Sequence, residues 1–223
     1  MARYRSSLRA PETRTRQDLD ARAVRFIPAP AGNTTPVLTE DQARRLLESI
    51  DVSTLVGLRD RALIGVMIYS FARIGAVVAM KVEDYYPAGK RWWLRLHEKG
   101  GKRHEMPAHH KLEAFIDEYL AAAGIREDGK IPLFRSAVGK TGVLTDKTMN
   151  RVDAYRMVRR RAAEAGYKIK LGCHVFRATG ITAYLEAGGT LENVQAMAGH
   201  ESPRTTKLCQ CRPRSCRGGA ARR

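Results

Sequence analysis

The sequence predicts a mainly α-helical domain that contains one small antiparallel β-meander. Apolar residues recur at helical spacing over most of residues 39–69 and 111–197. Between residues 82 and 108 the pattern changes to alternating and aromatic residues, which is typical of strands. Two turn sequences, Pro87-Ala88-Gly89 and Gly100-Gly101, divide that stretch into three segments. This meander is the only sheet that we expect.

The expected helices begin and end at recognisable capping residues. Thr39 and Gln42 have the spacing of a capping box and open a helix over residues 39–49. A second helix is expected over residues 58–69, and the chain then turns through residues 70–75 into a short third helix. Gly188-Gly189 is a stop signal between the last two helices. The helices expected after the meander cover residues 111–123, 148–165, 174–187 and 191–197.

Both ends of the chain differ in composition from the part between them. Residues 1–36 are polar, rich in Arg, Pro and Thr, and end in PAPAGNTTP, which has the composition of a linker. Residues 209–223 hold three cysteines and five arginines with almost no apolar periodicity. We therefore expect one folded domain over residues 37–208, flanked by a tail at each end.

The charge of the chain points to a polyanionic partner. The 223 residues carry a formal net charge of +17. Residues 209–223 contribute five arginines and no acid, and residues 1–25 contribute seven arginines against three acids, which leaves +8 for residues 26–208. Each phosphate that Lys or Arg neutralises releases condensed counterions, so nucleic acid is the expected partner.

Several other classes of protein are excluded at this stage. The longest apolar run covers residues 62–69, far short of the roughly 20 residues that span a bilayer. The N-terminus has no apolar signal region, so we expect a cytoplasmic, nucleoid-associated location and no membrane contact. The four cysteines show no paired C-x-x-C spacing, and the histidines near residues 97–110 lack acidic partners. We therefore expect no metal site, no disulfide framework and no small-molecule substrate.

Three separated basic motifs suggest chemistry on a phosphodiester. Arg73 lies in a turn between helices, Lys99 lies at a β-turn, and His174 and Arg177 lie one helical turn apart at the start of a helix. Guanidinium groups can hold the non-bridging phosphate oxygens, while His or Lys moves protons to and from the bridging oxygens. With 40 basic residues in the chain, this set could also arise by chance.

Residues 39–208 resemble the catalytic domain of tyrosine recombinases, the phage-integrase family, and most closely its transposon- and integron-like branch. The matching segments lie in the family's order and at similar spacings. They are YSFARIGAVVAMKVEDY, LHEKGGKRHEMPAH, HVFRATGITAYLEAGG and VQAMAGHESPRTTKL. The resemblance implies the recombinase catalytic-domain fold and strand exchange on duplex DNA by a homo-oligomer. It also implies that residues 1–36 are at most a remnant of an N-terminal DNA-binding domain.

The resemblance also assigns roles to residues. Arg73 and Arg177 would clamp the scissile phosphate, Lys99 would protonate the leaving 5′-oxygen, His174 would transfer a proton with the nucleophile, and His200 would hydrogen-bond the phosphate. The family's K-G-x-K-x-R pattern favours Lys99 over Lys102 for the site. The family's tyrosine attacks phosphorus to give a 3′-phosphotyrosyl link without a metal or cofactor. The side chains expected to contact DNA elsewhere are those of Lys102, Arg103, Arg204 and Lys207.

The chain departs from the family pattern in two places. The tyrosine is expected directly after TTKL, but Cys209 stands there and no tyrosine follows Tyr184. We interpret Tyr184 as a packing residue, and we expect no attack by Cys209, whose side chain is much shorter than a phenol. A frameshift at or just before codon 209 is our hypothesis for the change. Ala76 stands where many members carry an acid three residues after the first arginine, so a different group must orient Arg73.

Two functional hypotheses therefore remain after reading the sequence. The chain is either a recombinase or integrase domain whose tyrosine is lost only from this sequence, or a DNA-binding descendant that cannot cut. Cys173, next to His174, is a third possible nucleophile, but we interpret it as a buried, unreactive thiol. Trp92 and Trp93 alternate along one strand, so one is expected in the core and one outside.

Overall fold

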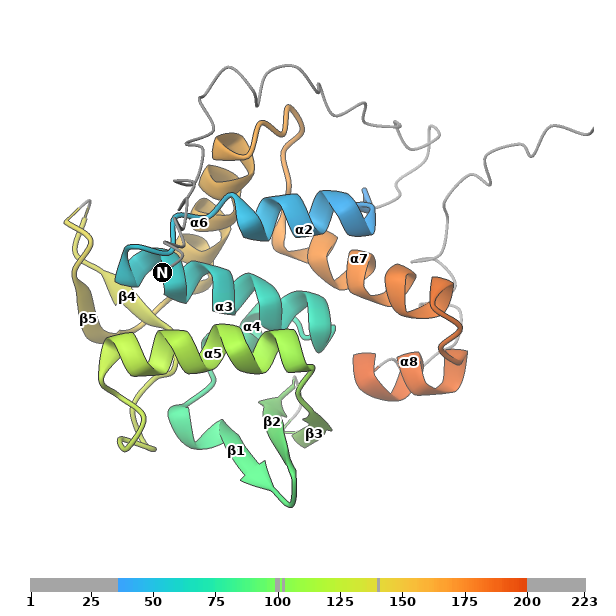
Figure 1. The fold of residues 1–223 in the computed structure, drawn as a ribbon, viewed down its shortest axis with the longest axis horizontal. Helices are drawn as coiled ribbons and strands as arrows, with labels where there is room; N and C mark the ends of the chain where they lie inside the picture. The colour runs from blue at the N-terminus through green and yellow to red at the C-terminus, as the bar shows by residue number, and fades with distance from the viewer. Residues whose placement is uncertain (1–35, 99–100, 102, 140, 200–223) are drawn as a thin grey trace, which may run out of the picture.

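The computed structural model describes residues 36–98, 101, 103–139 and 141–199, and over these it is a helical domain with two small antiparallel sheets (Figure 1). The two predicted tails, residues 1–36 and 209–223, lie outside the described residues except for Pro36, and they stay predictions. The elements, in chain order, are α2 (Glu40–Glu48), α3 (Leu55–Tyr69), α4 (Ile74–Val78), the 3-10 turn η1 (Val82–Asp84), β1 (Tyr85–Ala88), β2 (Arg91–His97), β3 (Arg103–Pro107), α5 (His110–Ala123), β4 (Arg135–Ala137), β5 (Leu144–Thr148), α6 (Arg151–Glu164), α7 (Cys173–Glu186) and α8 (Leu191–Ala198).

The predicted capping box at the first helix is confirmed. The Thr39 hydroxyl accepts a hydrogen bond from the Gln42 amide at 3.1 Å, and the Gln42 side chain accepts one from the Thr39 amide at 2.8 Å. The next helix, α3, begins three residues earlier than predicted. Thr54 caps it by accepting a hydrogen bond from the Gly57 amide, which leaves Leu55 as the first helical residue.

The predicted meander is confirmed as the sheet β1-β2-β3. Leu94 on the central strand pairs with Tyr85 and Met106, and all three side chains are buried in the core. The ring of Trp92 stacks on that of Tyr85 with 4.5 Å between centroids. Trp93 is also half-buried, so the expected contrast between an inner and an outer tryptophan is weaker than predicted.

The prediction of a single sheet was wrong, because β4 and β5 form a second hairpin. Its strands are short and half-exposed, and part of their pairing comes from the hydroxyls of Ser136 and Thr145, 2.6 Å apart. Such strands lack the apolar alternation that would reveal them in a sequence. The helix expected from residue 148 consequently begins at Arg151, after Asn150 caps the Asp153 amide.

Helix α3 is the centre of the domain and is buried on nearly all sides. It lies beside α5 and is crossed by α7 (Figure 1). The crossing is close because α7 carries Gly180 there: a Cβ atom at that position would lie 2.0 Å from the Ile68 carbonyl oxygen and 2.8 Å from the Phe71 ring. This contact fixes the end of α3 against α7.

A buried ionic cluster joins α3 to α6. Asp60 is fully buried, and its carboxylate accepts hydrogen bonds from Arg59, Arg160 and Arg161 at 2.6 to 3.2 Å. Arg59 also donates to the carbonyl of Arg135 on β4 at 2.7 Å. A buried carboxylate is tolerated only with such partners, so the cluster fixes how α3, α6 and β4 lie together.

We expect Gly180→Ala to destabilise the domain, because the new methyl group meets a backbone oxygen that cannot move aside. Overpacking of this kind costs about 1–3 kcal/mol. Gly65→Ala is the matched control: its methyl group would touch the Phe115 ring at 3.1 Å, and that side chain can shift. Thermal unfolding followed by circular dichroism checks both variants, and a melting temperature unchanged by Gly180→Ala would contradict the expectation.

Candidate functional site

A polar pocket of about 570 Å³ opens where four separate segments meet. These segments are the turn before α4 with α4 itself, the end of β2, the first residue of α6, and the first two turns of α7. The pocket brings together three of the residues predicted from the sequence, namely Arg73, His174 and Arg177. The full lining consists of Ala72, Arg73, Ile74, Gly75, Ala76, His97, Glu98, Arg151, Cys173, His174 and Arg177.

Arg73 supplies the most accessible charge among these three residues. It occupies the N-cap position of α4 with extended backbone angles, as the predicted turn requires, and makes no capping bond with its side chain. About 45% of that side chain is exposed, and Nη1 donates a hydrogen bond to Oε2 of Glu98 at 2.8 Å. The guanidinium group is thus held at one nitrogen while much of it faces the solvent.

Arg177 forms the buried floor of the pocket, with only 1% of the residue exposed. Its two terminal nitrogens donate to the carbonyl oxygens of Phe71 and Ala198. A guanidinium group has five N–H donors, and these two bonds tie the end of α3 to the end of α8. Arg177 therefore also holds the site together.

Phe71, whose carbonyl accepts a hydrogen bond from Arg177, has an unusual backbone conformation. Its φ of 56° lies in the left-handed region, and it is the only residue other than glycine with a positive φ in the part of the chain that the structure describes. A bulky residue in this region costs energy and persists only where its surroundings enforce it. Here the ring of Phe71 lies against Gly180 and its carbonyl accepts the Arg177 hydrogen bond.

His174 lies one helical turn before Arg177, as the i, i+3 spacing predicts. Although the residue as a whole is exposed, partial desolvation of its imidazole lowers the pKa of the ring, and the positive charges of Arg177 and Arg73 lower it further. The ring is therefore neutral at neutral pH and can accept a proton on one nitrogen. A group that shuttles a proton needs this state.

The two alternative nucleophiles described by the structure are poorly suited to the task. Burial raises the pKa of the Cys173 thiol to about 11, so the thiolate that would attack is scarce at neutral pH. Tyr184 does not line the polar pocket; its ring packs edge-on against Phe71 and its hydroxyl group accepts a hydrogen bond from Asn193 at 3.3 Å. The structure thus favours the packing interpretation of Tyr184.

Of the predicted site residues that do not line the pocket, only Arg103 lies in the part of the chain that the structure describes. The structure does describe Arg103, which is exposed, pairs with His97 across the β2-β3 ladder and does not line the pocket. The residues Lys99, Lys102, His200, Arg204, Lys207 and Cys209 lie outside the described residues.

Three lining residues were missed by the sequence reasoning. Glu98 enters the pocket from the end of β2, next to His97, whose Nε2 lies 3.3 Å from the buried carboxylate of Asp84. Arg151 reaches it from α6, with its guanidinium group about 3.3 Å from where a Cβ of Gly75 would lie. Only a tertiary contact brings these side chains to Arg73, so no local pattern could have indicated them.

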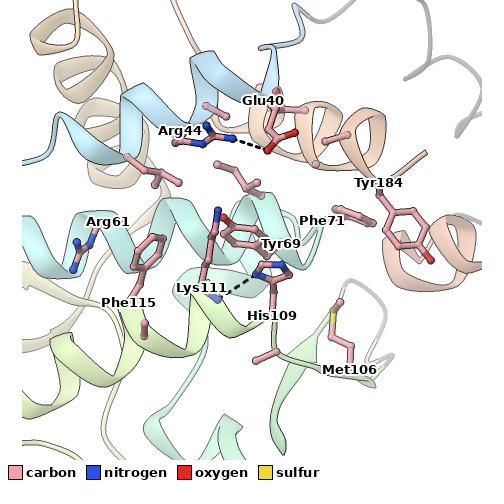
Figure 2. Close-up of a pocket in the computed structure, with 18 of the residues that line it drawn as sticks. Glu40, Arg44, Arg61, Tyr69, Phe71, Met106, His109, Lys111, Phe115 and Tyr184 are labelled. Carbon is pink, nitrogen blue, oxygen red and sulfur yellow. Dashed lines mark hydrogen bonds and ion pairs between the residues drawn. The ribbon is translucent and has the colours of Figure 1, made fainter. Parts of the chain in front are cut away.

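A second, more apolar cavity of about 690 Å³ lies between α2, α3, α5 and α7 (Figure 2). Figure 2 shows Tyr69 and His109 in its wall, where their rings stack with centroids 4.5 Å apart. It contains none of the three predicted site residues. Among the described residues no group of three or more His, Cys, Asp or Glu side chains could hold a metal ion, and no helix is long and apolar enough to cross a membrane.

Comparison with known proteins identifies the family of the chain. Residues 36–208 match the profile of the phage integrase family. Tyrosine recombinase XerC of Salmonella typhi is 30% identical over 173 residues, which cover 75% of this chain and 53% of that protein. Tyrosine recombinase XerD of Listeria innocua is 26% identical over 184 residues, which cover 81% of this chain and 59% of that protein. The chain therefore belongs to the phage integrase family.

Solved structures show the same fold. The crystal structure of XerA recombinase matches with a TM-score of 0.67 and 26% identity, covering 82% of this chain and 63% of that one. XerH recombinase bound to its palindromic difH substrate matches with a TM-score of 0.65 and 24% identity, and the match covers 82% of this chain and 51% of that chain. The chain spans about half the length of the curated relatives that it matches.

We expect Arg73→Gln to raise the pKa of His174, because a nearby positive charge that disfavours the imidazolium is removed. The pKa should stay below its ordinary value, since partial desolvation is the larger cause and is unchanged. NMR titration of the histidine ring protons measures the shift. Arg95→Gln, outside the pocket, is the control variant and should leave His174 unaffected, whereas an unchanged pKa in Arg73→Gln would refute the expected coupling.

Proposed function

We propose that this chain is the DNA-binding catalytic domain of a site-specific recombinase or integrase. The convergence of Arg73, His174 and Arg177 in one pocket carries the proposal, because these residues come from distant motifs and suit a single phosphate. The net charge of +8 over residues 26–208 supports duplex DNA as the partner. Such a partner would place the chain at the nucleoid.

The reaction we propose for the intact domain follows from the residue types. Arg73 and Arg177 would bind the non-bridging oxygens of the scissile phosphate and stabilise the charge that develops on them. His174, neutral at rest, would accept the nucleophile's proton, and Lys99 would donate one to the leaving 5′-oxygen. His200 would add a hydrogen bond to the phosphate. A tyrosine nucleophile would give a 3′-phosphotyrosyl intermediate, which preserves the bond energy for rejoining.

Cys209 supports a second candidate, a DNA-binding protein that holds a phosphate but does not cut beside it. Cysteine stands at the position where the family places its nucleophile, and the sequence has no tyrosine beyond Tyr184. Such a chain could still occupy recombination sites. Solved relatives include a lambda integrase dimer bound to a core site, and we infer that this chain also binds DNA as a homo-oligomer.

We expect the full chain to bind duplex DNA with a steep dependence on salt. A protein that makes six to ten phosphate contacts loses about 10³- to 10⁵-fold in affinity between 50 and 200 mM salt. Arg73→Gln should reduce the slope of log affinity against log salt concentration by about the amount that one phosphate contact contributes. Arg126→Gln, which removes a charge paired with Asp117 outside the pocket, is the matched control. Fluorescence anisotropy at several salt concentrations measures the slopes, and an affinity that does not respond to salt would refute the proposal.

We also expect the chain as it stands to form no covalent adduct with DNA. The substrate would be a duplex that the chain itself selects from a random-sequence pool, nicked next to the bound site to trap any intermediate. A denaturing gel detects the adduct. Cys209→Tyr is the informative companion: an adduct with this variant alone would show that only the nucleophile is missing. An adduct with the unchanged chain would contradict the second candidate.

A further inference from the structure

We propose that Glu98 is the positioning residue for Arg73, holding its guanidinium group ready for a DNA phosphate. The role in the reaction rests on the proposed function, whereas the contact itself is a feature of the fold. Oε2 of Glu98 accepts the hydrogen bond from Nη1 of Arg73 at 2.8 Å. The side chain of Glu98 is only 11% exposed, so the carboxylate is fixed while Arg73 remains reachable.

No nearer group in the site can do this. Helix α4, which follows Arg73, has the apolar sequence IGAVV, and Ala76 at its third position is buried and carries no polar atom on its side chain. Glu98 is the only acidic residue among the described residues that line the pocket. Apart from Arg73 itself, the other ionisable groups there are those of His97, His174, Arg151, Arg177 and Cys173, and none of them offers a negatively charged acceptor as a carboxylate does.

A carboxylate in a pocket for an anion needs a physical explanation. Its negative charge opposes phosphate binding, so attraction of the phosphate cannot be its contribution. Glu98 can instead contribute by fixing the position of Arg73. A long arginine side chain has many rotamers, and ordering it before phosphate binds removes the entropic cost of ordering it on binding. Because Glu98 contacts one terminal nitrogen, the remaining donors of the fork stay directed elsewhere.

The same contact also connects two parts of the site that are 25 residues apart in the sequence. Glu98 directly follows β2, and Arg73 directly precedes α4. In the sequence, Glu98 is followed by Lys99, the residue assigned to leaving-group protonation. The bridge therefore fixes the point from which the chain leaves β2 relative to the α3-α4 turn.

The test uses two variants of the full chain that remove the same charge. Glu98→Gln keeps a hydrogen-bond acceptor of the same length, and Glu98→Ala removes it. Glu105→Ala is the matched control, since Glu105 pairs with Arg95 at 2.8 Å on the same sheet but outside the pocket. Nitrogen-15 NMR of the arginine side chains reports the order of the Arg73 Nε–H group, whose signal is assigned from an Arg73→Lys sample. A melting curve for each variant verifies folding.

We expect Arg73 to be ordered in the unchanged chain, in Glu98→Gln and in Glu105→Ala, and disordered in Glu98→Ala. Titration with inorganic phosphate gives the second readout, in which Glu98→Gln should bind phosphate several-fold more tightly than Glu98→Ala. Both variants lack the charge, so any difference reports placement alone. Equal affinities, or an ordered Arg73 in Glu98→Ala, would overturn the proposal.

These outcomes are separate from the proposed function. If the chain fails to bind duplex DNA while Arg73 loses order in Glu98→Ala, the contact is real and the recombinase proposal is wrong. If the chain binds DNA and Arg73 stays ordered without Glu98, the recombinase proposal stands and the positioning role is wrong.

Discussion

The site depends on one buried arginine. Arg177 donates hydrogen bonds to the carbonyls of Phe71 and Ala198, and so joins the end of α3, the body of α7 and the end of α8 at one point. Its charge is tolerated in the interior because the carbonyls are fixed in place to accept those bonds. The left-handed backbone at Phe71 and the close approach at Gly180 both serve this junction. Because Arg73 lies only two residues after Phe71, this junction also determines the position of Arg73.

Carboxylates organise the arginines of this basic domain. The buried carboxylate of Asp60 pairs with three guanidinium groups, of which that of Arg160 is half exposed, and joins α6 to α3, while Glu98 holds Arg73 at the surface of the pocket. Cations packed near one another repel, and acidic side chains between them offset that repulsion.

The lowered pKa of His174 follows from the same arrangement. Partial desolvation and two neighbouring guanidinium groups favour the neutral ring, so the cations that would hold a phosphate also prepare the histidine to accept a proton. In the function that we propose, phosphate binding and proton transfer would therefore be coupled through electrostatics. The cavity in Figure 2 is chemically different, because rings and aliphatic side chains make up most of its wall. Of the cations that also line it, Arg44 pairs with Glu40 and Arg61 pairs with Glu118.

The sequence by itself determined the helices, the meander and the residues of the four motifs, because capping boxes, apolar periodicity and turn residues act over a few positions. Thr39 and Gln42 specified the start of α2 in this way, and His174 and Arg177 shared a helix face by spacing alone. Only the tertiary structure decided which groups meet from distant segments. Glu98 lies 25 residues from Arg73, and the β4-β5 hairpin depends on partners without apolar alternation. Such contacts are set by how helices pack, and no local pattern in the chain records them.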